Sequence, residues 1–148
     1  LRASISAASI NSNNAGAVNS QDIANTAWSF ATIRLRDGPL LAAIASAAIR
    51  SISAEADAQR LSMIAWSVAT LEFHHAPLRE AISAASIPRI SEYDAESLSN
   101  IAWSFADLPV RDLPLLKAIS SAAIRKISEY EVTNLGKLSW ANAFLGVA

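Results

Sequence analysis

The side chains of this chain that are best placed to do chemistry are cations that recur at a regular spacing. They are Arg50, Arg89, and Arg125 with Lys126, so that each stretch of about 37 residues carries one or two of them. Stacked side by side, they would form a basic stripe suited to a phosphate backbone. The alternative is structural, because a cation at a helix C-terminus stabilises the helix dipole by about 0.3–1 kcal/mol. Acidic residues that would neutralise the stripe follow in the next turn: Glu55, Glu92 and Glu129.

Three sets of equivalent positions carry different residue types in successive stretches of about 37 residues, and we call each set a column. They are Ala42, Glu80, Lys117; Ala45, Ser83, Ser120; and Ser46, Ala84, Ser121. Variable side chains on a constant frame are what a modular nucleic-acid reader requires. Alternatively, solvent-exposed helix positions vary because nothing constrains them, and Ser and Ala carry little hydrogen-bonding capacity. The predicted binding surface, on the first helix of each pair, is Ser46, Arg50, Glu80, Ser83, Arg89, Lys117, Ser120, Ser121, Arg125 and Lys126.

Patterns typical of catalysis or metal binding are missing from the sequence. His74 and His75 form the histidine pair of the chain, and Glu72 alone would not complete a metal site with them. There is no cysteine, no G-x-S-x-G motif and no glycine-rich phosphate loop, and the chain has only 4 glycines. We therefore expect no enzyme, no cofactor, no metal and no small-molecule substrate.

The apolar stretches are too short for a membrane-spanning protein, although the composition is hydrophobic. The chain is 52% hydrophobic with a mean hydropathy of +0.27. Its longest nearly uncharged apolar stretch, at 39–49, is well short of the ~20 residues that span a bilayer. The net charge of −1 creates no overall field that attracts nucleic acid or anionic lipid. We expect no membrane insertion.

A tryptophan-centred phrase divides the chain into four similar units. Its copies are NTAWSFATI at 25–33, MIAWSVATL at 63–71, NIAWSFADL at 100–108 and KLSWANAFL at 137–145, with successive tryptophans 37 or 38 residues apart. A second phrase, LRASISAASI in its first copy, recurs near the same period from Leu40, Leu78 and Leu115. Self-similarity at such a period indicates a solenoid of helix pairs.

Each unit contains two stretches with apolar residues at helical spacing. We therefore predict an all-α, right-handed α-solenoid of about four helix-turn-helix hairpins, with short connections between antiparallel neighbours. The predicted repeats are 1–38, 39–76, 77–113 and 114–148, which form one array over 1–148 that we expect to be part of a longer repeat protein. The eight predicted helices cover 1–12, 20–33, 39–53, 58–71, 77–91, 95–108, 114–128 and 132–145.

The predicted helix starts carry residues that cap helices. Asp37, His75 and Asp112 each stand two residues before a proline, as an N-cap followed by a proline in the first turn would. A second set of candidate caps stands nine residues before each tryptophan: Asn19, Asp57, Asp94 and Glu131. Pro88 falls late in a predicted helix, so we expect a kink or an early end there.

The tryptophans have two interpretations. Ala102 and Ala106, on either side of Trp103, would allow close helix approach with the indole filling the space between hairpins. Exposed aromatics would instead stack on single-stranded nucleic acid, at about 1–3 kcal/mol per base. The periodic apolar context favours packing.

The two best copies of the phrase, SQDIANTAWSFATI at 20–33 and AESLSNIAWSFADL at 95–108, resemble the octotricopeptide repeat, which is related in style to pentatricopeptide repeats. The resemblance covers essentially the whole chain. It implies a paired-helix solenoid that binds RNA in an organelle, a chloroplast or a mitochondrion, and that reads its partner on the concave face formed by the first helices.

Two functions remain open from the sequence. The first is single-stranded RNA binding in organellar RNA metabolism, which the resemblance and the recurring cations favour. The second is a protein-binding scaffold, a structural subunit of a large organellar complex without RNA contact. The near-neutral charge, the Ala- and Ser-rich helix faces and the apolar Leu1 and Phe144-Leu145 favour this second function.

Overall fold

The described part of the chain consists of helices joined by short turns. The computed structural model describes residues 19–55, 57–106 and 111–145, in which there is no strand. Seven α-helices and two 3₁₀ helices follow one another: α2 (Ser20–Thr32), α3 (Gly38–Glu55), α4 (Ala58–Thr70), α5 (Ala76–Ser86), η1 (Ile87–Glu92), α6 (Ala95–Ala106), α7 (Leu113–Arg125), η2 (Ile127–Glu129) and α8 (Val132–Leu145). The all-α prediction is confirmed, with seven α-helices instead of eight; the helix predicted over 1–12 lies outside the described residues.

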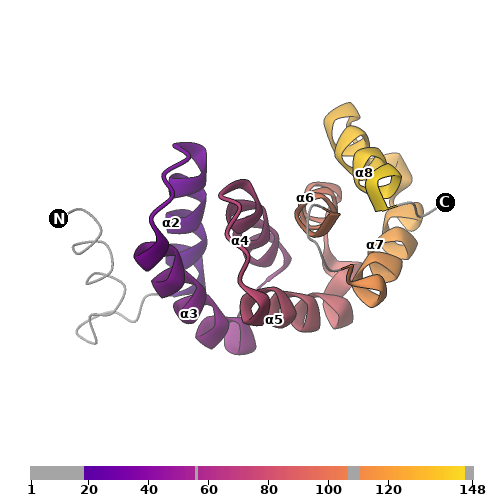
Figure 1. Ribbon diagram of the computed structural model, residues 1–148. Helices are drawn as coiled ribbons and strands as arrows, with labels where there is room; N and C mark the ends of the chain where they lie inside the picture. The colour runs from indigo at the N-terminus through magenta and orange to yellow at the C-terminus, as the bar shows by residue number, and fades with distance from the viewer. Residues whose placement is uncertain (1–18, 56, 107–110, 146–148) are drawn as a thin grey trace.

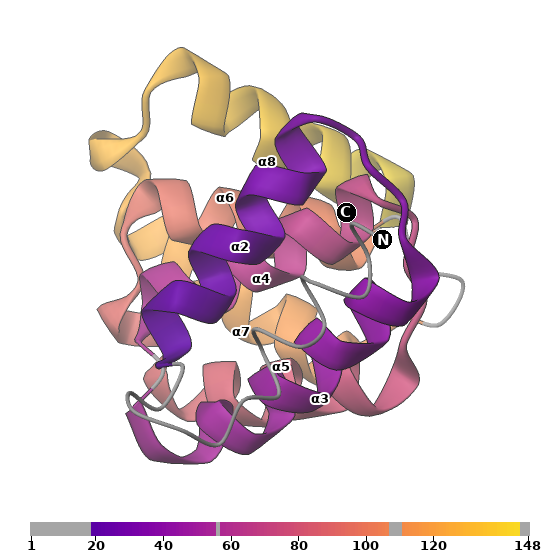
Figure 2. The ribbon, with the colours of Figure 1, turned by 90° about the vertical axis from the view of Figure 1, so that its left-hand side faces the viewer.

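The helices form two rows that curve together (Figure 1). One row consists of α2, α4, α6 and α8, which pack side by side in that order, and we call it the inner row. The outer row consists of α3, α5, η1 and α7 and follows the outside of the curve. The view from the N-terminal side shows both rows stacked in depth (Figure 2). Neighbours in the inner row pack more extensively than neighbours in the outer row, as the inside of a curve requires.

Small side chains form most of the contact surface within the inner row. The buried ones are Ser20, Ala24, Ala27, Ala31, Ser62, Ala65, Ser67, Ala95, Ser97, Ser99, Ala102, Ser104 and Ala106. Ser67 and Ser104, each directly after a tryptophan, donate to the backbone carbonyl oxygens of Met63 and Asn100 at 2.7 and 2.6 Å. Because the hydroxyls are satisfied within their own helices, serine can be buried almost as cheaply as alanine.

Six of the seven residues predicted to cap helices do so, and the cap at Glu131 stays a prediction. Oδ1 of Asn19, Asp57 and Asp94 accepts a hydrogen bond from a backbone N–H three residues later, at 2.9, 2.9 and 2.7 Å. The outer-row helices begin in the same way, at Asp37, at Asp112, and at His75 through Nδ1. Such caps satisfy N–H groups that no carbonyl of the helix can reach.

Pro88 ends α5 early, as predicted. The α-helix stops at Ser86, and the chain continues as the 3₁₀ helix η1, which contains the proline. A proline inside an α-helix removes one donor and clashes with the preceding turn, so the tighter 3₁₀ form replaces the α-helix here. Since α3 has no proline at this position, it runs on to Glu55.

Two tyrosines, Tyr93 directly after η1 and Tyr130 directly after η2, occupy equivalent positions. They differ in the hydrogen bonding of their hydroxyls. Tyr93 is fully buried, its hydroxyl donates to Ser86 Oγ at 2.7 Å, and burial raises its pKa to about 12. Tyr130 stands 37 residues later, where the residue equivalent to Ser86 is Ala123. Its buried hydroxyl has no hydrogen-bond partner among the described residues, and burial raises the pKa of Tyr130 also.

This difference predicts opposite effects of two serine and alanine exchanges. Ser86→Ala leaves the Tyr93 hydroxyl buried and unsatisfied, and should lower the free energy of unfolding by about 1–3 kcal/mol. Ala123→Ser offers the Tyr130 hydroxyl a partner, and should raise that free energy by up to about 1 kcal/mol. Urea denaturation of both variants measures the effects. Equal destabilisation by the two changes would contradict this assignment.

Candidate binding surfaces

The predicted binding surface lies on the outer row, on the convex side of the curve. Of its residues, Ser46, Glu80, Lys117 and Ser121 are exposed. The expectation that first helices line a concave face is wrong, because α3, α5 and α7 follow the outside of the curve in Figure 1. The physical reason is that the helices of the other row pack more extensively on one another and therefore lie on the inside of the curve.

One of the three variable columns points into the protein. Ala45 is completely buried, Ser83 is only 6% exposed, and Ser120 is half-buried. Each follows directly after a core isoleucine, and the contact between neighbouring outer-row helices covers it. Ser83 is therefore not available for reading a partner. The binding role of the exposed positions in the other two columns stays a prediction.

The recurring cations lie at the ends of outer-row elements. Arg50, Arg89 and Arg125 are exposed, and Lys126 is half-buried. The Lys126 Nζ atom donates to the Tyr93 carbonyl oxygen at 2.7 Å, and Arg50 and Arg89 also have interactions within the chain. Much of this charge therefore serves the fold, and its role in phosphate binding stays a prediction.

The tryptophans lie on the inner row and are only partly covered. Trp28 is 47% exposed, and Trp66 and Trp103 are half-buried. The prediction that the indoles fill the space between hairpins is therefore wrong for Trp28 and too strong for the other two. Small residues let adjacent helices meet directly, which leaves each indole at the edge of the contact. The Trp140 side chain lies outside the described residues.

A groove of about 370 Å³ runs along the inner row beside these tryptophans. The residues that line it are Trp28, Gln59, Ser62, Met63, Trp66, Asp94, Glu96, Ser97, Asn100 and Lys137. Lys137 Nζ donates to Asn100 Oδ1 at 2.8 Å, which links α8 to α6 across the groove. The groove thus offers two indoles and several amide or hydroxyl groups, with one cation against two carboxylates.

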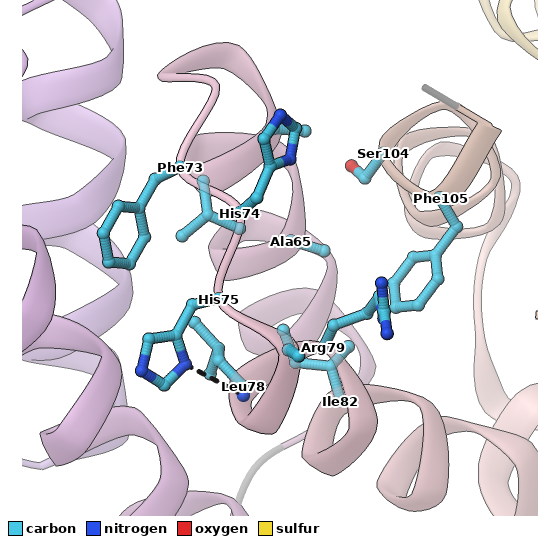
Figure 3. A pocket seen from close by; sticks show the side chains of 12 residues that line it. Ala65, Phe73, His74, His75, Leu78, Arg79, Ile82, Ser104 and Phe105 are labelled. Carbon is cyan, nitrogen blue, oxygen red and sulfur yellow. Dashed lines mark hydrogen bonds between the residues drawn. The ribbon is translucent and has the colours of Figure 1, made fainter. Parts of the chain in front are cut away.

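A smaller cavity of about 100 Å³ lies where α4, α5 and α6 meet (Figure 3). Its walls are mostly apolar and include Ala65, Val68, Leu78, Ile82 and Phe105. Its polar lining comes from His74, His75, Arg79 and Ser104. In Figure 3, Arg79 extends from α5 toward Phe105 and Ser104 on α6, while His74 lies in the turn before α5.

The two histidines of this cavity have different surroundings. His75 caps α5, because its Nδ1 accepts the Leu78 N–H at 3.2 Å, and its ring stacks on Phe73 with centroids 5.7 Å apart. His74 is exposed. Within the described ranges, no group of three or more acidic, histidine or cysteine side chains is arranged to hold a metal ion. None of the helices described combines the length and apolar character needed to cross a bilayer.

Comparison with protein families shows which family the chain belongs to. A family model described as "RNA-editing substrate-binding complex 6 protein" (RESC6) matches residues 13–143. The chain belongs to the RESC6 family. A search of curated proteins found no significant match.

Membership of the RESC6 family overturns the octotricopeptide resemblance. That resemblance rested on the tryptophan-centred helix and the repeat period, which follow from the packing of helix pairs. The proline-rich signature of octotricopeptide repeats is reduced here to single residues, Pro39, Pro77 and Pro114. The shared pattern therefore reports how the helices pack and not the family.

The sequence interpretation missed both the inner-row groove and the cavity between α4, α5 and α6, whereas a third hollow, of about 500 Å³ between α3, α5 and η1, is lined by the predicted residue Arg89. Asn100 and Lys137 lie three residues before their tryptophans, and this column could have been found by extending the repeat comparison to the second helices. The signal for the cavity was Arg79, since the equivalent positions of the neighbouring helix pairs hold Leu41 and Leu116, while the first copy of the phrase holds Arg2. The approach of Phe105 and Ser104 to Arg79 depends on tertiary packing.

The partial exposure of the tryptophans predicts a modest role in stability. Phe105 is 2% exposed, so Phe105→Ala should cost about 3–5 kcal/mol of unfolding free energy. Trp28→Ala should cost less than about 2 kcal/mol, because the indole is 47% exposed and leaves little cavity. Chemical denaturation of both variants tests this difference. A Trp28→Ala variant as unstable as Phe105→Ala would show that the indole is part of the core.

Proposed function

We propose that this chain is a non-catalytic, protein-binding scaffold that acts as a subunit of an RNA-editing assembly. The name of the RESC6 family refers to a substrate-binding complex for RNA editing, which supports a place among other subunits. The curved double row supports the finer proposal of a right-handed α-solenoid segment. The location that goes with this function is an organelle, a mitochondrion instead of a chloroplast.

The observation that carries the proposal is a set of exposed apolar side chains on the last described helix pair. Ile127 is 56% exposed, whereas the equivalent Ile52 and Ile90 are 7% and 8% exposed. Leu135 is 39% exposed, whereas the equivalent Leu61 and Leu98 are completely buried. Ile124 and Val132 of the same helix pair are 74% and 86% exposed, and we call these four residues the end face.

Ile127 and Leu135 of the end face are thus exposed where the equivalent residues of earlier helix pairs are buried, and a further helix pair of this protein or of a partner would cover them. Burying such a surface stabilises association by roughly 25 cal/mol per Å² of apolar area removed from water. Contiguous exposed apolar residues of this kind are typical of protein–protein contacts. The fitting partner surface is another helix pair with an Ile-, Leu- and Ala-rich side.

The end face gives a test of the scaffold function. Ile127→Lys with Leu135→Lys should abolish co-purification of partner subunits from the native organelle, because two buried lysines would need desolvation. The unfolding free energy of the isolated protein should fall by less than about 2 kcal/mol for Leu135→Lys, which is 39% exposed, and by less for Ile127→Lys, which is 56% exposed.

The matched control is Ile33→Lys, which places the same charge at a side chain that is 68% exposed on the opposite end of the array. It should retain the partners. Co-purification that is unchanged in the double variant would argue against the end face. A wild-type protein that runs as a monomer without partners would argue against the scaffold function itself.

A second candidate function is direct binding of single-stranded RNA, and the inner-row groove favours it. Trp28 and Trp66 both line the groove and offer partly exposed indoles for base stacking. Gln59 and Asn100 add hydrogen-bonding groups of the kind that read base edges. Asp94 and Glu96 oppose phosphate binding, which places this function second.

The RNA function predicts which row carries the contacts. Trp28→Ala with Trp66→Ala should weaken binding of a single-stranded oligonucleotide by tenfold or more, as the loss of about 1–3 kcal/mol per stacked base implies. Lys117→Glu, on the outer row, should leave the affinity nearly unchanged. Fluorescence anisotropy at low salt measures both. The reverse result would assign RNA to the outer-row surface predicted from the sequence.

A further inference from the structure

The cavity between α4, α5 and α6 lies where Arg79 interrupts a column that is leucine in α3 and α7; in the sequence, two of the four copies of the phrase carry arginine at this position, as Arg2 and Arg79. Leu41 in α3 and Leu116 in α7 occupy equivalent positions and are 3% and 6% exposed. In α5 the same position holds Arg79, whose side chain is half-buried. An arginine at a position that otherwise buries leucine brings a permanent positive charge to an apolar contact. We call the resulting space the Arg79 cavity.

The other polar groups of the Arg79 cavity are already engaged or lie at its rim. The Ser104 hydroxyl donates to the Asn100 carbonyl oxygen at 2.6 Å. The His75 Nδ1 atom holds the first turn of α5, and His74 is exposed. Neither ion pair found among the described residues involves Arg79. The guanidinium is therefore the group in the cavity best able to take up an anion.

The size and walls of the cavity define the occupant. An engineered apolar cavity of about 150 Å³ in another protein holds a benzene molecule, so one of about 100 Å³ accommodates a short side chain. Ala65, Val68 and Ile82 would contact its aliphatic part. The single guanidinium matches one negative charge, which a carboxylate supplies with bidentate geometry.

We propose that the Arg79 cavity receives a glutamate or aspartate side chain from a partner protein. This inference rests on the proposed scaffold function and names the chemistry of one contact. An RNA phosphate is a poorer fit, because it lies between two riboses on a hydrated backbone and has no apolar stem to contact the walls.

The test uses butyrate, which reproduces a glutamate side chain, and its neutral counterpart butyramide. Titrated into the full chain and followed by amide NMR, butyrate should shift the resonances of Arg79, Ser104 and Phe105 in a saturable manner. The affinity for butyramide should be at least about tenfold lower than the affinity for butyrate, since butyramide forms no charge-assisted pair with the guanidinium.

Arg79→Leu is the decisive variant, because it restores the residue that the other two helix pairs carry. It should fold with equal or greater stability, fill the cavity and lose the butyrate response. Arg111→Leu, an exposed cation in the equivalent turn of the next helix pair, should keep that response. Equal binding of butyrate and butyramide, or an unchanged response in Arg79→Leu, would overturn the proposal.

Inorganic phosphate separates the two kinds of macromolecule. It should shift the same resonances less than butyrate does, and a stronger response would overturn the carboxylate assignment in favour of a nucleic-acid phosphate. The result of these titrations does not depend on the result of the end-face experiment. A failed butyrate titration with intact co-purification rejects the Arg79 cavity alone, whereas a monomer without partners rejects the scaffold function.

Discussion

The close approach of alanine and serine faces in the inner row is the constraint on which the rest of the structure depends. Side chains such as Ala24, Ala65 and Ala102 are buried and small, so the helix backbones can lie near one another. Neighbouring outer-row helices, such as α3 and α5, pack less extensively on one another. The difference bends the two rows into a curve whose inside is the inner row.

This packing also decides what reaches the surface. Because small residues fill the contact between inner-row helices, the indoles are displaced to its edge, where they line the groove with Asn100 and Lys137. On the outer row, isoleucines at the equivalent positions of successive helix pairs are buried by the next pair until the end face.

Arg79 shows how one substitution in a repeat can create a specific site. The surrounding frame is set by Leu78, Ile82 and Phe105, each of which is at most 2% exposed. An arginine at this one position changes a filled apolar contact into a charged cavity without altering the fold around it.

The sequence by itself determined the helical class, the repeat period and the places where helices begin and end. Asn19, Asp57, Asp94 and Pro88 act through their nearest neighbours along the chain, so their effects can be read locally. Tertiary structure alone decided which row lies inside the curve, that Ser83 is buried and that Trp28 is exposed. Those outcomes depend on how closely separate helices approach, and that distance is set jointly by side chains from different repeats.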